Sequence, residues 1–126
     1  MTRVLTEGSL TRDLMKTIEQ VMLSAVVLKH ADRFTSGIPD LTVTWRGVTS
    51  WWECKHTPFK RKGLQTLTAQ RLAAHGICRY IIFDAKRTRI VHPNNLDTWR
   101  DAALSCNGYD LEWVARQMKS FHAEDK

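Results

Sequence analysis

The alternation of apolar and polar residues is clearest in the middle of the chain, where it predicts two strands joined by a tight turn. Leu41, Val43 and Trp45 alternate with threonines, which is the period of a strand with one buried face. Gly47 breaks the alternation, and glycine supplies the positive φ that two-residue hairpin turns need. Residues 48–55 are rich in β-branched and aromatic side chains and predict the second strand.

The turn sets the register of these two strands. With Arg46 and Gly47 as the loop, Asp40 faces Glu53. Directly opposed residues of an antiparallel pair have Cβ atoms about 4.5–5.5 Å apart, so both carboxylates are expected on one face. Lys55 is expected on the same face, one step beyond Glu53. The opposite face is expected to be the core side, and it carries Leu41, Val43, Trp52 and Cys54.

Two opposed carboxylates repel each other and destabilise a sheet unless a cation lies between them. Mg²⁺ is commonly held by one or two carboxylates together with waters and phosphate oxygens. The pair Asp40 and Glu53 therefore predicts a site for Mg²⁺ or Mn²⁺, with the ammonium group of Lys55 beside it. The alternative is two solvated acids on a polar strand face, which a register slip of one residue would separate.

The rest of the chain predicts helices around this hairpin. Leu14, Ile18, Val21 and Ala25 recur at helical spacing, which predicts a helix over residues 9–25 that runs into a short strand. The further predicted elements are a helix from residue 64 or 67 to 75, strands at 79–83 and 88–91, a helix at 96–105 and a last helix capped by Asp110. This order predicts an α/β fold, as one domain over residues 1–126.

Length, charge and cysteine content narrow the class of protein. A chain of 126 residues fits one domain with a single core. Its net charge of +6 and pI of 9.6 suit a polyanionic partner. No apolar run approaches the ~20 residues of a membrane span, and no signal peptide is recognised. The three cysteines and five histidines lack disulfide or zinc-ligand spacing, which favours a reducing cytoplasm, and the histidines are interpreted as surface or loop residues.

Three short motifs in this order resemble those of the PD-(D/E)xK nuclease superfamily. They are Gly37-Ile38-Pro39-Asp40-Leu41, the triplet Glu53-Cys54-Lys55, and Gln70 on the following helix. Within the superfamily they are most similar to the virus-type replication-repair nuclease (VRR-NUC) domains. The resemblance covers about residues 7–91 and implies a restriction-endonuclease-like αβββαβ core, with a mixed sheet flanked by helices. Two C-terminal helices, at about 94–122, lie outside it and are expected to cover the core.

The resemblance implies a role for each matched residue. Asp40, Glu53 and the backbone carbonyl of Cys54 would hold Mg²⁺ or Mn²⁺. Lys55 would orient the attacking water or offset negative charge that develops on the phosphate. Gln70 would orient a water or a phosphate oxygen near the lysine. The side chain of Cys54 is expected to point into the core.

The family also carries a glutamate on its first helix. Glu7 continues the inward-facing stripe if the helix reaches back that far, whereas Glu19 is offset from it, so Glu7 is favoured. Trp51 shares the carboxylate face, where it either stacks on a base or sugar or serves packing. DNA phosphates are expected to meet cations near this face. The candidates are Lys29, Arg33, Lys60, Arg61, Lys62 and Arg71.

The function that the resemblance implies is a divalent-metal-dependent DNA endonuclease in replication, recombination or repair, with no small-molecule cofactor and no membrane. Stand-alone, phage-associated members of the family are thought to act as homodimers on branched DNA such as four-way junctions. Domains fused to other modules cut flaps. A chain of 126 residues resembles the first kind, so a homodimer in the cytoplasm of a bacterial host is expected. The alternative is a nucleic-acid-binding module without catalysis.

Overall fold

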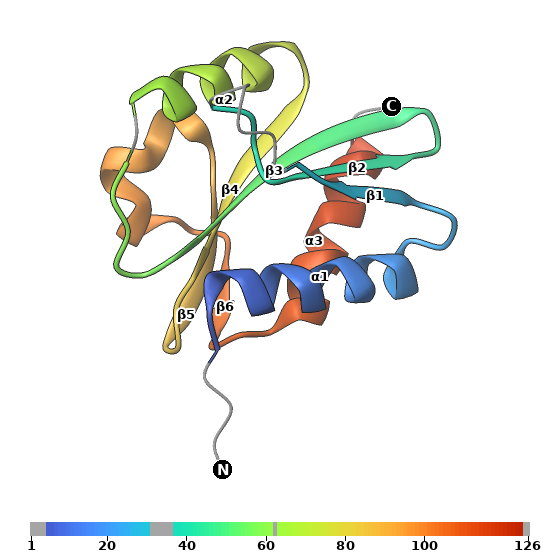
Figure 1. Cartoon of the computed structure of the whole chain (residues 1–126), viewed down its shortest axis with the longest axis horizontal. Coiled ribbons are helices and arrows are strands. Elements are labelled where there is room, and N and C mark those ends of the chain that lie inside the picture. The colour runs from blue at the N-terminus through green and yellow to red at the C-terminus, as the bar shows by residue number, and fades with distance from the viewer. Residues whose placement is uncertain (1–4, 31–36, 62, 125–126) are drawn as a thin grey trace.

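The computed structural model describes residues 5–30, 37–61 and 63–124, and its strands form one six-stranded sheet (Figure 1). The helices are α1 (Glu7–Val21), α2 (Gly63–His75), the 3-10 helix η1 (Pro93–Asp101) and α3 (Leu111–Glu124). The strands are β1 (Val26–Lys29), β2 (Leu41–Trp45), β3 (Val48–His56), β4 (Ile77–Phe83), β5 (Arg87–Val91) and β6 (Ser105–Asn107). The predicted α/β class and the order α-β-β-β-α-β are confirmed.

The strands follow one another across the sheet in chain order, from β1 to β6. Neighbouring strands are antiparallel except β3 and β4, which run parallel. A parallel pair needs a crossover connection, and α2 provides it. The sheet is therefore mixed, as predicted. In the described ranges, no helix is both long enough and apolar enough to cross a membrane.

The hairpin of β2 and β3 has the predicted register. All five of its residue pairs follow from a loop made of Arg46 and Gly47. Their φ angles are +52° and +81°, which are values of a primed two-residue turn whose twist matches that of the strands. Extended by one pair beyond the end of β2, this register places Asp40 opposite Glu53.

Each face of the sheet carries its own apolar cluster. On one face α1 and α3 lie together across the strands (Figure 1), and the four hairpin residues predicted on the core side all belong to this cluster. On the other face lies α2, with η1 beside it. The smaller cluster there contains Ala69, Cys78, Tyr80, Ile82, Val91 and Leu96. The cover that α3 gives to the core agrees with the prediction.

The segment before α3 differs from the prediction. Residues 96–105, predicted as a helix, form the end of η1 and then lead into a sixth strand, β6. Asn95 and Thr98 have non-helical backbone angles inside η1, so a continuous α-helix does not form. Residues 105–107 instead pair with the edge of β5, whose free backbone N–H and C=O groups form hydrogen bonds with β6. The last helix begins as predicted, since Asp110 Oδ1 accepts a hydrogen bond from the N–H of Trp113 at 3.0 Å.

Gly37 lies at a point where the loop before β2 touches α2. Its φ is +89°, in the left-handed region that favours glycine. A Cβ atom at this position would lie 2.9 Å from Oγ1 of Thr68 and 3.0 Å from the carbonyl oxygen of Leu64. The missing side chain therefore lets the loop that carries Asp40 pack directly on α2.

We expect Gly37→Ala to lower the free energy of unfolding by about 1–3 kcal/mol, because it adds both backbone strain and a steric clash. Urea denaturation measures this loss. Gly63→Ala is the matched control, since a Cβ atom there meets nothing within 4 Å and φ is not positive. Equal stability of the two variants would show that the contact with α2 does not constrain the loop.

Candidate active site

The predicted site lies where β2 ends and β3 continues. The pairing of β2 stops at Leu41, whereas β3 runs on to His56, so the N–H groups of residues 54 and 56 need other acceptors. Two carboxylates supply them. The N–H of Cys54 donates to Asp40 Oδ2 at 2.9 Å, and the N–H of His56 donates to Glu7 Oε2 at 3.1 Å. The carboxylates of Asp40 and Glu7 thus accept the hydrogen bonds that β2 would accept if it continued alongside the end of β3.

Asp40 and Glu53 lie side by side, as the register predicts. The N–H of Asp40 donates to Glu53 Oε1 at 3.1 Å. Glu53 is only 1% exposed, and Lys55 Nζ lies 3.1 Å from its Oε2. Glu53 pairs with Tyr80 of β4, whose side chain belongs to the cluster under α2. The two carboxylates and the ammonium group therefore form one compact group on the α2 side of the sheet.

Burial and like charge change the protonation of this group. The pKa of Glu53 is raised from 4.5 to about 8, first because the carboxyl is buried and next because Asp40 is negatively charged. Lys55 acts in the opposite direction without cancelling the effect. Without a bound cation, the pair therefore retains a proton at neutral pH. A divalent cation would take the place of this proton.

The donor atoms of this corner fit a hard divalent cation. The carboxylates of Asp40 and Glu53 supply oxygen atoms, and the backbone carbonyl of Cys54 projects toward the same edge as the Cys54 N–H. Across the described ranges no cluster of three or more His, Cys, Asp or Glu side chains suited to a metal is found. Two carboxylates completed by a carbonyl and waters suit Mg²⁺ or Mn²⁺, whereas zinc sites use more protein side chains.

The structure brings Glu7, and not Glu19, to this edge. The helix α1 reaches back to Glu7 because Thr6 caps it, with the N–H of Ser9 donating to Thr6 Oγ1 at 3.1 Å. The Glu7 carboxylate then meets β3 as described above. Glu19 is exposed and lines an open hollow on α1 with Arg12, Met15 and Lys16.

Gln70 lies beside cations and not within hydrogen-bond contact of the acid pair. It lines an open hollow of about 750 Å³ on α2 together with Lys60 and Arg61. Arg61 also forms an ion pair with Asp97 of η1 at 2.5 Å. The structure thus groups Gln70 with two of the predicted DNA contacts.

The other predicted DNA contacts are more dispersed. Lys29 is exposed at the end of β1, and Arg71 is exposed on α2. Arg33 and Lys62 lie outside the described residues.

His30 is a neighbour of the acid pair that the sequence analysis missed. Its N–H donates to the carbonyl oxygen of Asp40 at 2.7 Å, which extends the ladder of β1 and β2 by one pair. Its Nε2 lies 2.9 Å from Thr42 Oγ1, and its ring stacks on Trp51 with centroids 5.7 Å apart. The signal was the alternation of β1, which continues from Leu28 to His30 and would have placed the imidazole on the carboxylate face.

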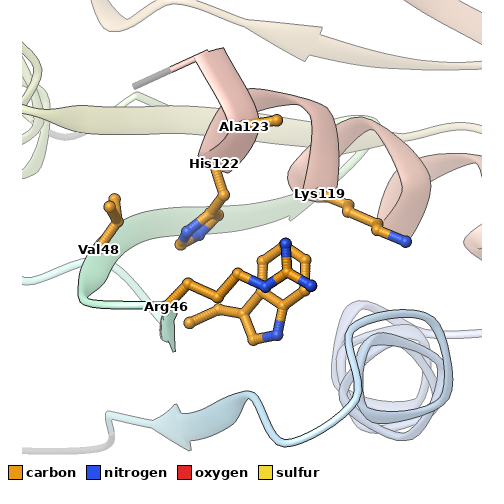
Figure 2. Close-up of a pocket in the computed structure, with 6 residues that line it drawn as sticks. Arg46, Val48, Lys119, His122 and Ala123 are labelled. Carbon is orange, nitrogen blue, oxygen red and sulfur yellow. The ribbon is translucent and has the colours of Figure 1, made fainter. Parts of the chain in front are cut away.

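A partly open hollow of about 210 Å³ lies at the opposite end of the hairpin, next to the turn (Figure 2). Figure 2 shows Arg46 lying across an aromatic ring; the guanidinium carbon is 4.2 Å from the ring centroid of Trp45. Lys119 and His122 of α3 complete the wall. The six residues that line it include no carboxylate, so we assign it no part in metal binding.

The raised pKa of Glu53 predicts a stability that depends on pH. The folded state binds a proton at Glu53 more tightly than the unfolded chain, so this stabilisation is fully present below about pH 4.5 and is lost as the pH rises through about 8. In the presence of a chelator, we expect the free energy of unfolding to fall by a few kcal/mol, as an order of magnitude, across this window. Urea denaturation at several pH values measures the slope.

Glu53→Gln is the decisive variant for this slope, because a neutral amide keeps the shape of the side chain without titrating. We expect a nearly flat profile for Glu53→Gln and an unchanged slope for the exposed Glu19→Gln. If Glu53→Gln keeps the slope of the parent protein, the acid pair is not its origin.

No protein-family model matches the chain, and no curated protein matches it. Among solved structures, one described as "VRR_NUC domain" aligns at 25% sequence identity with a TM-score of 0.45. The alignment covers 58% of this chain and 83% of that chain. The chain is thus similar to a structure described as a VRR_NUC domain.

Proposed function

We propose that this protein is a divalent-metal-dependent DNA endonuclease that hydrolyses phosphodiester bonds. One observation carries the proposal: two adjacent carboxylates, Asp40 and the buried Glu53, share a corner with the ammonium group of Lys55. Two carboxylates in contact destabilise a fold unless a proton or a cation lies between them. Strongly perturbed acids of this kind are typical of catalytic sites.

Each residue of this corner has a distinct role in the proposal. Asp40, Glu53 and the Cys54 carbonyl would hold Mg²⁺ or Mn²⁺. When bound, such a cation lowers the pKa of a water and offsets the negative charge of the phosphate. The backbone N–H groups that bind the two carboxylates hold them in one orientation, which reduces the reorganisation that binding requires. Lys55 stands beside them as a donor to a water or to a phosphate oxygen.

The proposed substrate is DNA, recognised by its shape. The net charge of +6 favours a polyanion, and the hollow that carries Lys60, Arg61 and Gln70 offers contacts to phosphates. Contacts to phosphates position a strand without reading its sequence. By resemblance, we propose that the substrates are branched DNA, either four-way junctions or flaps, in replication, recombination or repair.

We also propose that the protein acts as a homodimer joined through β1. This strand is an edge of the sheet, and its apolar side chains Val26 and Leu28 are each 53% exposed. Unpaired edge strands are templates for pairing with another chain. Antiparallel pairing of two copies about Val27 would place Val26 of one copy opposite Leu28 of the other. It would also place both acid pairs on the same face, which suits paired cuts across a symmetric junction.

A cleavage assay tests the proposed activity. We expect the protein to cut a four-way junction or a flap in Mg²⁺ or Mn²⁺, and to cut nothing in chelator. Asp40→Asn, Glu53→Gln and Lys55→Ala should each lower the cleavage rate by roughly 10²–10³-fold while DNA binding is retained. Arg116→Ala is the control, because the one described residue that this exposed α3 side chain pairs with is Glu112, and the rate should stay unchanged.

The same assay decides between the nuclease and a nucleic-acid-binding module without catalysis. Binding of branched DNA in chelator, with no product from any substrate in either metal, would favour the binding module.

Sedimentation analysis tests the dimer. We expect the parent protein to sediment as a dimer and Leu28→Lys as a monomer, because a charge would be buried at the pairing edge. Leu67→Lys is the control, since this exposed α2 residue lies away from β1. A monomeric parent protein, or a dimeric Leu28→Lys, would contradict pairing through β1.

A further inference from the structure

A second polar hollow lies beside β4 and β5 and shares no lining residue with the acid pair. Its volume is about 380 Å³, and it opens between β4, β5, η1 and α3. Arg79 of β4 pairs with Trp52, which faces the α1 and α3 side, whereas Glu53 faces α2. The polar part of the wall is formed by Arg79, His92, Asn95, Thr98 and Asp101. None of these residues takes part in the proposed nuclease chemistry.

Arg79 is a half-buried cation without a counter-charge in the described part of the chain. One of its terminal nitrogens donates to the carbonyl oxygen of Cys78 at 2.8 Å, and its guanidinium carbon lies 5.0 Å from the ring centroid of Phe121. None of the ion pairs among the described residues includes it. A guanidinium has five N–H groups, so most of them have no protein acceptor there. Because Arg79 is only half-buried and lines the hollow, these N–H groups are accessible from it and can donate to a ligand.

The neighbours of Arg79 add donors. His92 Nδ1 accepts a hydrogen bond from the N–H of Asn94 at 3.0 Å, which leaves the proton of a neutral imidazole on Nε2. Burial, and next the charge of Arg79, lower the pKa of His92, so the ring is neutral at neutral pH. The amide of Asn95 lines the same hollow. A guanidinium, an imidazole N–H and an amide together are suited to an oxyanion.

We propose that this hollow binds a phosphate group, with Arg79 as its principal contact. The planar guanidinium fork matches the oxygens of a phosphate in a bidentate arrangement. The volume falls within the range of small-ligand sites and leaves room for an attached organic group along the apolar wall of Leu104 and Phe121. The ligand is either a free phosphate monoester or a phosphate of a nucleic acid strand.

Asp101 also lines the hollow and opposes an anion by like charge. Its side chain is exposed, and it forms no ion pair with Arg79 within the residues that the structure describes. Neutralisation of Asp101 should therefore raise the affinity for phosphate, whereas loss of Arg79 should lower it.

A nuclear magnetic resonance titration of the whole protein with inorganic phosphate, at constant ionic strength, tests the site. We expect saturable shifts of the His92 ring signals and a rise in the pKa of His92, because a bound anion favours the imidazolium. Arg79→Met should weaken binding by at least about tenfold, a loss typical of one charged hydrogen bond. Arg116→Met, which removes a charge on α3 away from the hollow, should leave phosphate binding unchanged. Asp101→Asn should tighten phosphate binding.

Two further ligands separate the possible sources of the phosphate. A nucleoside 5′-monophosphate that binds more tightly than inorganic phosphate supports a free monoester. An oligonucleotide without terminal phosphates that displaces inorganic phosphate supports a strand.

Absence of saturable shifts, or an equal loss in Arg79→Met and Arg116→Met, would overturn the proposal. If Arg79→Met does not fold, Asp101→Asn decides, since unchanged affinity in that variant contradicts the site. Neither outcome depends on cleavage activity, so the result is independent of the proposed nuclease function.

Discussion

Two carboxylates lie in contact at a point where the sheet excludes most water, and this repulsion is the constraint on which the site depends. Glu53 is buried against Tyr80 and beneath α2, whereas Asp40 leads into β2. Their mutual charge has to be neutralised by a proton, by Lys55 or by a cation. The first two are present in the protein alone, and the pKa of Glu53 stays raised although Lys55 opposes the shift. The pair of Asp40 and Glu53 can therefore still bind a cation.

The surrounding fold holds this unfavourable pair in place. The apolar cluster beneath α1 and α3 fixes the hairpin through Leu41, Val43 and Trp52, which are fully buried. On the other side, Gly37 anchors the loop before β2 against α2. Each large apolar side chain that is fully buried contributes roughly 1.5–3 kcal/mol to the stability of the fold, so a few such residues offset the cost of one buried acid. The hairpin is thus stabilised from one face and used chemically on the other.

The two faces of the sheet also differ in the charged groups discussed here: one carries the acid pair and the other carries a cation. The acid pair lies on the α2 side, and Arg79, which has no ion pair with any described residue, lies one strand position away on the other side. Alternation along a strand separates such groups by the thickness of the sheet, although they are close in the pairing pattern. A phosphate held at Arg79 would therefore not occupy the acid corner.

The sequence by itself determined the hairpin register, because the alternation of residues 41–45 and the turn at Gly47 leave one pairing that buries the apolar side. That register brought Asp40 opposite Glu53, and periodicity determined α1, α2 and the last helix. Tertiary structure alone decided which glutamate reaches β3, how η1 leads into β6, and that Arg79 has no ion-pair partner among the described residues. These outcomes depend on the ends of elements and on contacts between distant segments, and local patterns do not encode where an exposed backbone edge or a charge finds its partner.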